Sequence, residues 1–485
     1  MRHRDLLLLA ALIAVAAFMR GMFLFRAPLF VRHDSVTYLQ TGYELARGQG
    51  FDLPLRRTPL YPLLIGGVVW ALGEDLDGLA LVQHLLGLGT VVATYLLGKA
   101  MFGRLAGFLA GVLVAISAPL LIYEHYILAE PLFIPLLVIG MLLVVTALQR
   151  ERAWLYVLGG LVLGLAALSR PIGQALLAVA PLAIVVHKGD LRAALRPAAL
   201  VLTGFALVLV PWVIRGALAT GRVGSAGAVG QTLVGRIIRH DEGFVIPGPD
   251  SPTNDTDPTR VAIRRLVLTQ MARDARPSAI AHRVREQYGL SEVEANAALQ
   301  DVALEIVTGQ PQRFFWGTLS KFRRLLVGED ERLRVHWSTR KDGELRDTWT
   351  AEQSIAHLYS PPSEVEEREY QTAEALTRIF QPYQWAAPLT LLTLLGLGWG
   401  LIRGPRGPTA LLALTIVALV FPSALLVGYV PRYRYPADPL LAVLAAGGLV
   451  PLGLLARIAV RRLANARAGA PERPRPAADV PEVSA

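Results

Sequence analysis

Long blocks of predominantly apolar residues recur along this chain, and they limit its fold more than any other feature. Each block holds about 17–25 residues with almost no charge, the length that a helix needs to cross the hydrocarbon core of a bilayer. The blocks cover residues 5–25, 79–99, 104–123, 126–149, 153–169, 172–187, 194–214, 386–403, 409–430 and 436–456. A helix is tolerated in lipid because it satisfies its own backbone hydrogen bonds. The sequence therefore predicts an all-α polytopic membrane protein with about ten transmembrane helices.

The overall composition agrees with this prediction. Of the 485 residues, 53% are hydrophobic and 18% are charged, whereas soluble proteins carry about 25% charged residues. The net charge is +10, but the basic residues gather at the ends of apolar blocks and in one hydrophilic insert, so nucleic acid needs no role. The absence of cysteine excludes disulfides and thiolate metal sites. The first block lacks a small-x-small cleavage site, so we expect an uncleaved helix with Arg20 near its outer end, snorkelling or facing protein.

One apolar segment, Pro59 to Leu72, is too short to cross and is expected to lie at the membrane surface. If the N-terminus is cytoplasmic and this segment does not cross, every short cytoplasmic loop is basic, as the positive-inside rule requires. The loop residues concerned are Lys99, Arg104, Arg150, Arg152, Lys188, Arg192, Arg196, Arg403, Arg406, Arg457, Arg461 and Arg462. We therefore expect a multi-pass protein of the plasma (inner) membrane.

A hydrophilic insert separates two groups of apolar blocks, and the same topology places it outside. Capping boxes at Ser291 with Glu294 and at Ser363 with Glu366 predict helices in it. Pro311 is expected to open a helix whose aromatic and basic residues suit a membrane surface. The insert is thus predicted as a mixed, partly helical extracytoplasmic domain. The predicted organisation is a catalytic transmembrane module at 1–215 with a first outer loop at 26–78, the outer domain at 216–384, C-terminal transmembrane helices at 385–460 and a disordered cytoplasmic tail at 461–485.

Ionisable residues from distant parts of the chain converge on the predicted outer face, where they are costly unless they have a function. Asp34 follows the first block and precedes a helical stretch that contains Tyr38. Asp34 could cap that helix, or it could act as a general base just above the bilayer. Glu130 lies about one turn into the fourth block and needs an arginine, a ligand or a proton. Glu124 and His125 could equally be ordinary loop residues.

Three arginines at the same face, Arg170, Arg432 and Arg434, have few acidic neighbours in sequence. The planar guanidinium favours phosphate and carboxylate partners. Each arginine alone could simply snorkel to lipid headgroups. Together they make a phosphate-binding site plausible.

The order of these features resembles the GT-C superfamily, specifically the bacterial protein O-mannosyltransferase-like and aminoarabinose-transferase-like (dolichyl-phosphate-mannose-protein mannosyltransferase-like) group. The resemblance covers most of the chain. It is carried by Asp34 with Tyr38, Arg57-Thr-Pro-Leu-Tyr61-Pro, Ala129-Glu130-Pro131, Ser169-Arg170-Pro171, Pro211-Trp212-Val-Ile-Arg215 and Arg432-Tyr-Arg434-Tyr-Pro436.

The resemblance implies an inverting glycosyltransferase that uses a sugar linked to polyprenyl phosphate. It implies Asp34 as catalytic base, Glu130 at the second acidic position, and Arg170, Arg432 and Arg434 at the donor phosphate. The substrate cleft would include Tyr38, Arg57, Tyr61, Glu124 and His125. Members of the group generally need no metal, and no cofactor is expected here. The chain has Asp34-Ser35 where an Asp-Glu pair is common, which leaves metal assistance and acceptor activation in question.

The expected partners are the polyprenyl-phosphate sugar, membrane lipids and an acceptor that is a lipid, a glycan or a protein. Two other functions stay open at the level of sequence. A secondary transporter would use Glu130 and Arg170 to bind substrate or protons, although transporter sites usually lie near the bilayer midplane. A ligase or polymerase of lipid-linked glycans would share the substrates without needing an aspartate base.

Overall fold

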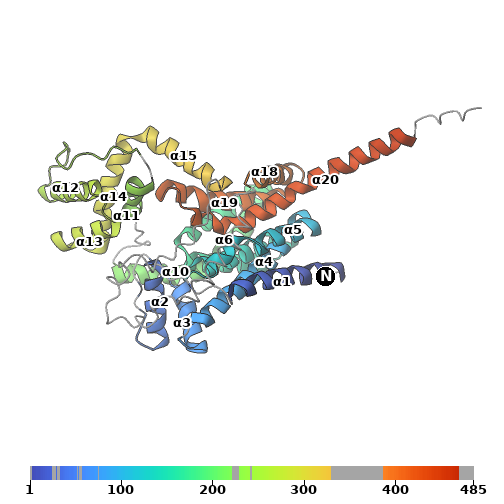
Figure 1. Ribbon diagram of the computed structural model, residues 1–485, viewed down its shortest axis with the longest axis horizontal. Coiled ribbons are helices and arrows are strands. Elements are labelled where there is room, and N and C mark those ends of the chain that lie inside the picture. The colour runs from blue at the N-terminus through green and yellow to red at the C-terminus, as the bar shows by residue number, and fades with distance from the viewer. Residues whose placement is uncertain are drawn as a thin grey trace, which may run out of the picture.

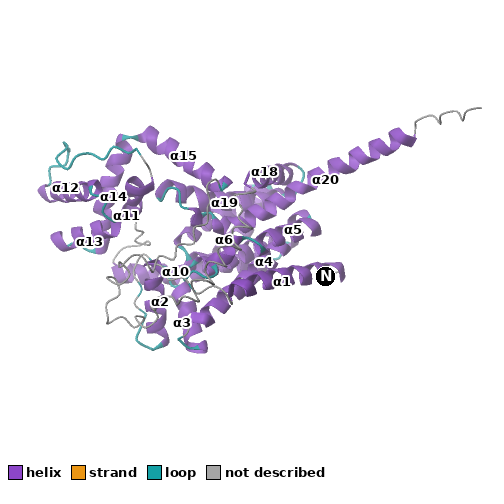
Figure 2. Cartoon of the chain, in the orientation of Figure 1, coloured by secondary structure: helices purple, strands orange, loops and turns teal. Residues whose placement is uncertain are grey.

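In the computed structural model the chain is built from helices, which Figure 1 labels in chain order. Figure 2 shows no strand in the part of the chain that the structure describes. The described residues are 3–24, 29, 33–51, 53, 57–74, 76–220, 229–240, 243–328 and 386–468.

Among these residues, seven helices or adjoining pairs of helices are long and apolar enough to cross a membrane. They are α1 (His3–Leu24), α4 (Leu76–Phe102), α7 (Glu130–Arg150), the short η1 (Pro171–Ala175) with α9 (Leu176–Lys188), α10 (Leu191–Thr220), α19 (Arg406–Leu426), and the segment that ends in α20 (Asp438–Ala468). Shorter apolar helices are α3 (Leu60–Leu72), α5 (Arg104–Ala115), α8 (Ala153–Ser169) and α18 (Ala386–Ile402). The chain is thus an all-α polytopic membrane protein, as predicted.

Ion pairs join the basic ends of these helices. Asp5 at the start of α1 pairs with Lys99 (2.9 Å) and with Arg104 (2.5 Å), which flank the α4–α5 connection. Glu151 after α7 pairs with Lys188 at the end of α9. The predicted cytoplasmic loops therefore lie at one end of the helix bundle, and the loops that carry the candidate site lie at the other.

Two helices near the site end lie across the direction of α1 and α4 (Figure 1). They are α2 (His33–Ala46) and α3, which pack against each other as a hairpin. At 13 residues, α3 is about 20 Å long and falls short of the roughly 30 Å hydrocarbon core. The close packing requires glycine: a Cβ at Gly42 would lie 2.5 Å from Ile65 Cγ2. The prediction that residues 59–72 do not cross agrees with this geometry.

The described part of the insert forms a helical domain with a core of its own. Its helices are α11 (Val229–Gly235), the π-helical turn η2 (Arg236–His240), α12 (Pro258–Ala272), α13 (Pro277–Tyr288), α14 (Glu292–Gly309) and α15 (Pro311–Val327). The capping box at Ser291 and Glu294 is present, and Pro311 opens α15 as predicted. The expected box at Ser363 and Glu366 lies outside the described residues.

Two boundaries differ from those expected. The block at 104–123 is not continuous: α5 ends before Ile116 and the short α6 (Ala118–Tyr123) follows. Pro119 explains the break, because it has no N–H to donate to the carbonyl oxygen of Ala115 and is tolerated in the first turn of a new helix, where it lies in α6. At the other end of the chain, α20 continues to Ala468, past residue 461 where the tail was expected to begin. Alanine, leucine and arginine, which are good helix formers, make up residues 461–468 apart from Asn465.

Candidate active site

Asp34 lies between two guanidinium groups that come from distant parts of the chain. Nη2 of Arg57, in the segment before α3, donates to Oδ1 of Asp34 at 2.8 Å. Nη2 of Arg432, in the short helix η5 (Pro431–Tyr433) between α19 and α20, donates to Oδ2 at 3.2 Å. Both carboxylate oxygens are therefore held, and a third of the Asp34 side chain remains exposed. The carboxylate binds these arginines instead of capping α2.

The α2–α3 hairpin positions the Asp34–Arg57 pair. At the opposite end of the hairpin, the Tyr43 hydroxyl donates to the carbonyl of Glu74. The segment that enters α3 is fixed by the Thr58 hydroxyl, which donates to the carbonyl oxygen of Ser169 at 2.8 Å. Arg57 is thereby brought beside α2, next to the end of α8.

Arg57 also contacts two other residues of α2. Its Nε donates to Thr37 Oγ1 at 3.1 Å and its Nη1 donates to the Tyr38 hydroxyl at 3.3 Å. The guanidinium carbon lies 4.7 Å from the centre of the Tyr38 ring, within cation–π range. Burial raises the pKa of Asp34, but the charges of Arg432 and Arg57 outweigh it and hold that pKa well below its usual range. Asp34 is thus ionised throughout the physiological pH range.

Glu130 and Arg170 form a second ion pair close to the first group. Oε1 of Glu130, at the start of α7, lies 2.5 Å from Nη1 of Arg170, which follows α8. Glu130 is buried, so the arginine partner that its position requires is present. The ring of Tyr433 links the two groups: its centre lies 5.5 Å from the Arg170 guanidinium carbon and 5.2 Å from that of Arg432. Two acidic residues and three arginines therefore surround Tyr433 and Tyr38.

Arg434 has a different neighbour. Its Nε lies 3.1 Å from Oδ1 of Asp438, at the start of α20. Both side chains are buried, whereas Arg432 points to Asp34. The side chains of Arg432 and Arg434, which the sequence grouped together, thus have different partners, because the backbone turns between η5 and the next short helix, η6 (Tyr435–Ala437).

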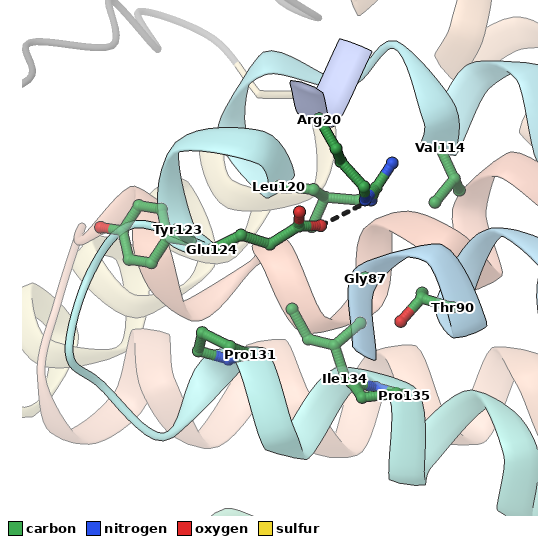
Figure 3. A pocket seen from close by; sticks show the side chains of 10 residues that line it. All are labelled: Arg20, Gly87, Thr90, Val114, Leu120, Tyr123, Glu124, Pro131, Ile134 and Pro135. Carbon is green, nitrogen blue, oxygen red and sulfur yellow. Dashed lines mark hydrogen bonds and ion pairs between the residues drawn. The ribbon is translucent and has the colours of Figure 1, made fainter. Parts of the chain in front are cut away.

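Three residues expected in the substrate cleft belong to a buried polar network beside the site. Glu124 is its centre, since Oε1 accepts from Arg20 at 2.5 Å and Oε2 lies 2.7 Å from Nδ1 of His84. The Nε2 atoms of His84 and His125 are 2.8 Å apart. Figure 3 shows the Arg20–Glu124 pair at a small cavity between α1, α4 and α7. Tyr61, fully buried, adjoins the network through its partner Gln83.

This network holds the chain segment that leads into Glu130. Gln83 accepts from the Tyr61 hydroxyl at 2.5 Å and donates to the carbonyl oxygen of Glu124 at 2.8 Å. A Cβ at Gly87 would lie only 1.8 Å from Oε1 of Glu124, so glycine is what lets the carboxylate reach α4. Glu124, His125 and Tyr61 are thus joined through Gln83 and His84 of α4, on the inner side of the site.

Arg20 faces protein, one of its two expected placements. The other partners, His84, Gln83 and Tyr433, were not singled out from the sequence. His84 and Gln83 lie within an apolar block, and their polarity at membrane depth was a usable signal. Tyr433 lies between the two arginines of its motif, but the sequence does not show that its ring lies beside the guanidinium groups of both Arg170 and Arg432. No cluster of three or more potential metal ligands occurs among the described residues.

Part of the chain matches a known protein family. Residues 56–214 match the family model of the dolichyl-phosphate-mannose-protein mannosyltransferases. This stretch contains Arg57, Glu130 and Arg170, whereas Asp34 and Arg432 lie outside it. A search of curated proteins finds no match.

Solved structures also match the chain. The archaeal oligosaccharyltransferase AglB from Archaeoglobus fulgidus, in complex with an inhibitory peptide and a dolichol-phosphate, is 15% identical with a TM-score of 0.49. That match covers 97% of this chain and 53% of the other, so this chain spans about half the length of that protein. ArnT from Cupriavidus metallidurans bound to undecaprenyl phosphate is 14% identical with a TM-score of 0.39, and the match covers 91% of this chain and 77% of the other.

Proposed function

We propose that this protein is an inverting membrane glycosyltransferase that moves a sugar from a polyprenyl-phosphate donor to an acceptor at the extracytoplasmic face. The observation that carries the proposal is the ionised carboxylate of Asp34, held beside a group of arginines at one end of a membrane helix bundle. The match of residues 56–214 to the mannosyltransferase family supports the same reaction class.

The site has the charges that such a donor requires. A polyprenyl chain stays in the bilayer, so its phosphate lies at headgroup depth, level with the outer ends of the helices. Arg432 and Arg170 would bind the phosphate oxygens through their planar guanidinium groups. Negative charge grows on that phosphate as it leaves, and fixed cations stabilise it most in the transition state. We propose that the arginines supply this positive charge without a metal or other cofactor.

Asp34 would act as the general base. In the proposed step the acceptor oxygen or nitrogen forms a bond to the anomeric carbon while its proton moves to Asp34. The bond from the anomeric carbon to the phosphate oxygen breaks, and the polyprenyl phosphate leaves with that electron pair. Attack from the side opposite the phosphate inverts the anomeric configuration.

Donor binding and base strength are linked in this arrangement. While Asp34 is paired with Arg57 and Arg432 its pKa is held low, so it accepts a proton poorly. A donor phosphate competes with Asp34 for Arg432. When that guanidinium turns to the phosphate, Asp34 loses an opposing charge and becomes a stronger base. Donor binding would thus activate the base.

The test is consumption of polyprenyl-phosphate-linked sugars by the purified protein, with Asp34→Asn as the variant. We expect transfer to fall by at least about 100-fold, the usual contribution of a positioned general base. Donor affinity should be unchanged or higher, because the carboxylate that competes for the arginines is gone. Transfer at the wild-type rate by Asp34→Asn would remove Asp34 from the mechanism.

A matched control is Glu44→Gln, which changes a carboxylate of the same helix that accepts a hydrogen bond from Gln40 of that helix. It should transfer sugar normally. If the wild-type protein consumes no lipid-linked sugar but exchanges solutes across vesicles, the chain is a transporter and the proposal fails.

A further inference from the structure

Helix α15 leaves an apolar stripe uncovered. One side of the helix is packed, with Thr318 and Leu325 buried. On the other side Phe315, Trp316 and Leu319 are 59%, 63% and 44% exposed. Their spacing of three and four residues places them on one helical face. An exposed patch of large apolar side chains such as this one marks a surface that contacts protein or membrane.

The stripe adjoins exposed apolar side chains of a helix long and apolar enough to span a membrane. Phe322 of α15 packs edge-to-face on Phe421 of the membrane-spanning α19, with ring centres 5.5 Å apart. Phe421 and Val417, one turn earlier in α19, are themselves exposed on the outside of the bundle. Phe322 thus lies between the exposed apolar side chains of α15 and those of α19. Figure 1 shows α15 descending from the outer domain toward α18 and α19.

Basic residues border the stripe. Arg313 and Arg323 are exposed near its two ends. Tryptophan beside arginine is the composition favoured where acyl chains meet headgroups. Cationic side chains at that depth are attracted by anionic lipid phosphates.

Contacts with the transmembrane bundle fix the orientation of the stripe. Arg236, buried after α11, donates to the carbonyl of Leu425 at the end of α19 and also lies 4.2 Å from the ring centre of Phe314. Arg324 lies 4.2 Å from the ring centre of Tyr429, just after α19. One end of α15 is thus connected to the end of α19 through Arg236, and the other contacts the residue Tyr429 just after α19. These contacts fix the direction of the exposed stripe relative to the bundle.

We propose that α15 is an interfacial helix, which inserts Phe315, Trp316 and Leu319 among the acyl chains and binds anionic lipid headgroups through Arg313 and Arg323. The occupant of the stripe is the bilayer that already surrounds α19. This proposal does not depend on the reaction at Asp34.

The chain has no cysteine, so a single spin label reports one position of the full-length protein. We would attach a nitroxide to Leu319→Cys in vesicles of phosphatidylcholine with phosphatidylglycerol. The measurement is the accessibility of the nitroxide to oxygen, which concentrates in lipid, and to a water-soluble nickel chelate. Two matched controls have comparable exposure: Leu207→Cys on the transmembrane α10 and Leu304→Cys on α14 of the outer domain.

We expect the label at Leu319 to behave like that at Leu207, with high oxygen and low nickel accessibility. Accessibility like that at Leu304 would overturn the proposal by placing the stripe in water. Protection from both reagents would also overturn it, because a second copy or another part of the chain would then cover the stripe.

The headgroup part of the proposal has its own test. Omitting phosphatidylglycerol should raise the nickel accessibility of the Leu319 label at least twofold. In the double variant Arg313→Gln and Arg323→Gln that dependence on lipid charge should disappear. A label insensitive to lipid charge in the wild-type background would refute headgroup binding by these arginines.

Discussion

Asp34 and Arg432 are 398 positions apart and form one ion pair. At the scale of single residues, the partners of each arginine decide its role better than its place in a motif. Arg432 reaches an acidic residue that is one-third exposed, where a ligand phosphate can compete for it. Arg434 is buried against Asp438, and taking away one member of a buried ion pair leaves an uncompensated charge.

These two arginines should therefore respond differently to the same substitution. We expect Arg432→Ala to weaken binding of a polyprenyl-phosphate donor with little change in thermal stability. Arg434→Ala should lower the free energy of unfolding by about 3–5 kcal/mol, because it strands the carboxylate of Asp438. Donor titration and thermal unfolding of both variants in detergent distinguish them. Equal donor binding by wild type and Arg432→Ala would argue against a phosphate role for Arg432.

At the scale of elements, the connection between α6 and α7 depends on a buried network from neighbouring helices. Glu124 is held by Arg20 from α1 and by His84 from α4, while Gln83 of α4 binds the carbonyl oxygen of Glu124. Since this connection leads directly into Glu130, the network determines where the Glu130–Arg170 pair lies. Its residues lie beside the ion pairs of the site and hold this connection in place.

Two glycines of α4 test how tightly this network is packed. Alanine at Gly87 would place its Cβ 1.8 Å from Oε1 of Glu124. A Cβ at Gly89 would have no heavy atom outside its own helix backbone within 4 Å. We expect Gly87→Ala to lower the free energy of unfolding by about 1–3 kcal/mol through overpacking. Gly89→Ala should be neutral or stabilising by up to about 1 kcal/mol, since alanine favours helix. Thermal unfolding measures both, and equal stability of the two variants would contradict the packing described.

Sequence predicted the elements well for a physical reason. Apolar length and basic helix ends are set by the bilayer, so α1, α4, α7 and α19 could be recognised without knowing their neighbours. The pairings could not be. His84 and Arg20 meet Glu124 only through tertiary packing, and nothing in the motif around Arg432 and Arg434 reveals that the two side chains diverge.

At the scale of the whole molecule, the helix bundle has a basic end and a site end. Ion pairs from Asp5 and from Glu151 gather the basic loops at the first end. The α2–α3 hairpin, Arg170 and Arg432 meet at the second. The charge bias predicts that the basic end is cytoplasmic.

Single cysteines can establish this orientation. Asp77→Cys in the first turn of α4 and Asn254→Cys in the outer domain should react with a membrane-impermeant maleimide on intact cells. Arg403→Cys, after α18, should react only once the cells are permeabilised. All three positions are exposed. Labelling of Asp77→Cys and Asn254→Cys from opposite sides would invalidate the arrangement.

The pairing of Asp34 with Arg432 has a consequence for how the protein is made. The first 220 residues can enter the bilayer and pack through α1 to α10, yet Asp34 then has only Arg57 beside it. Its second guanidinium arrives after α19 has been inserted, when nearly nine-tenths of the sequence has left the ribosome. Incomplete chains would thus carry residues 56–214 in the membrane while lacking one of the two arginines that hold Asp34.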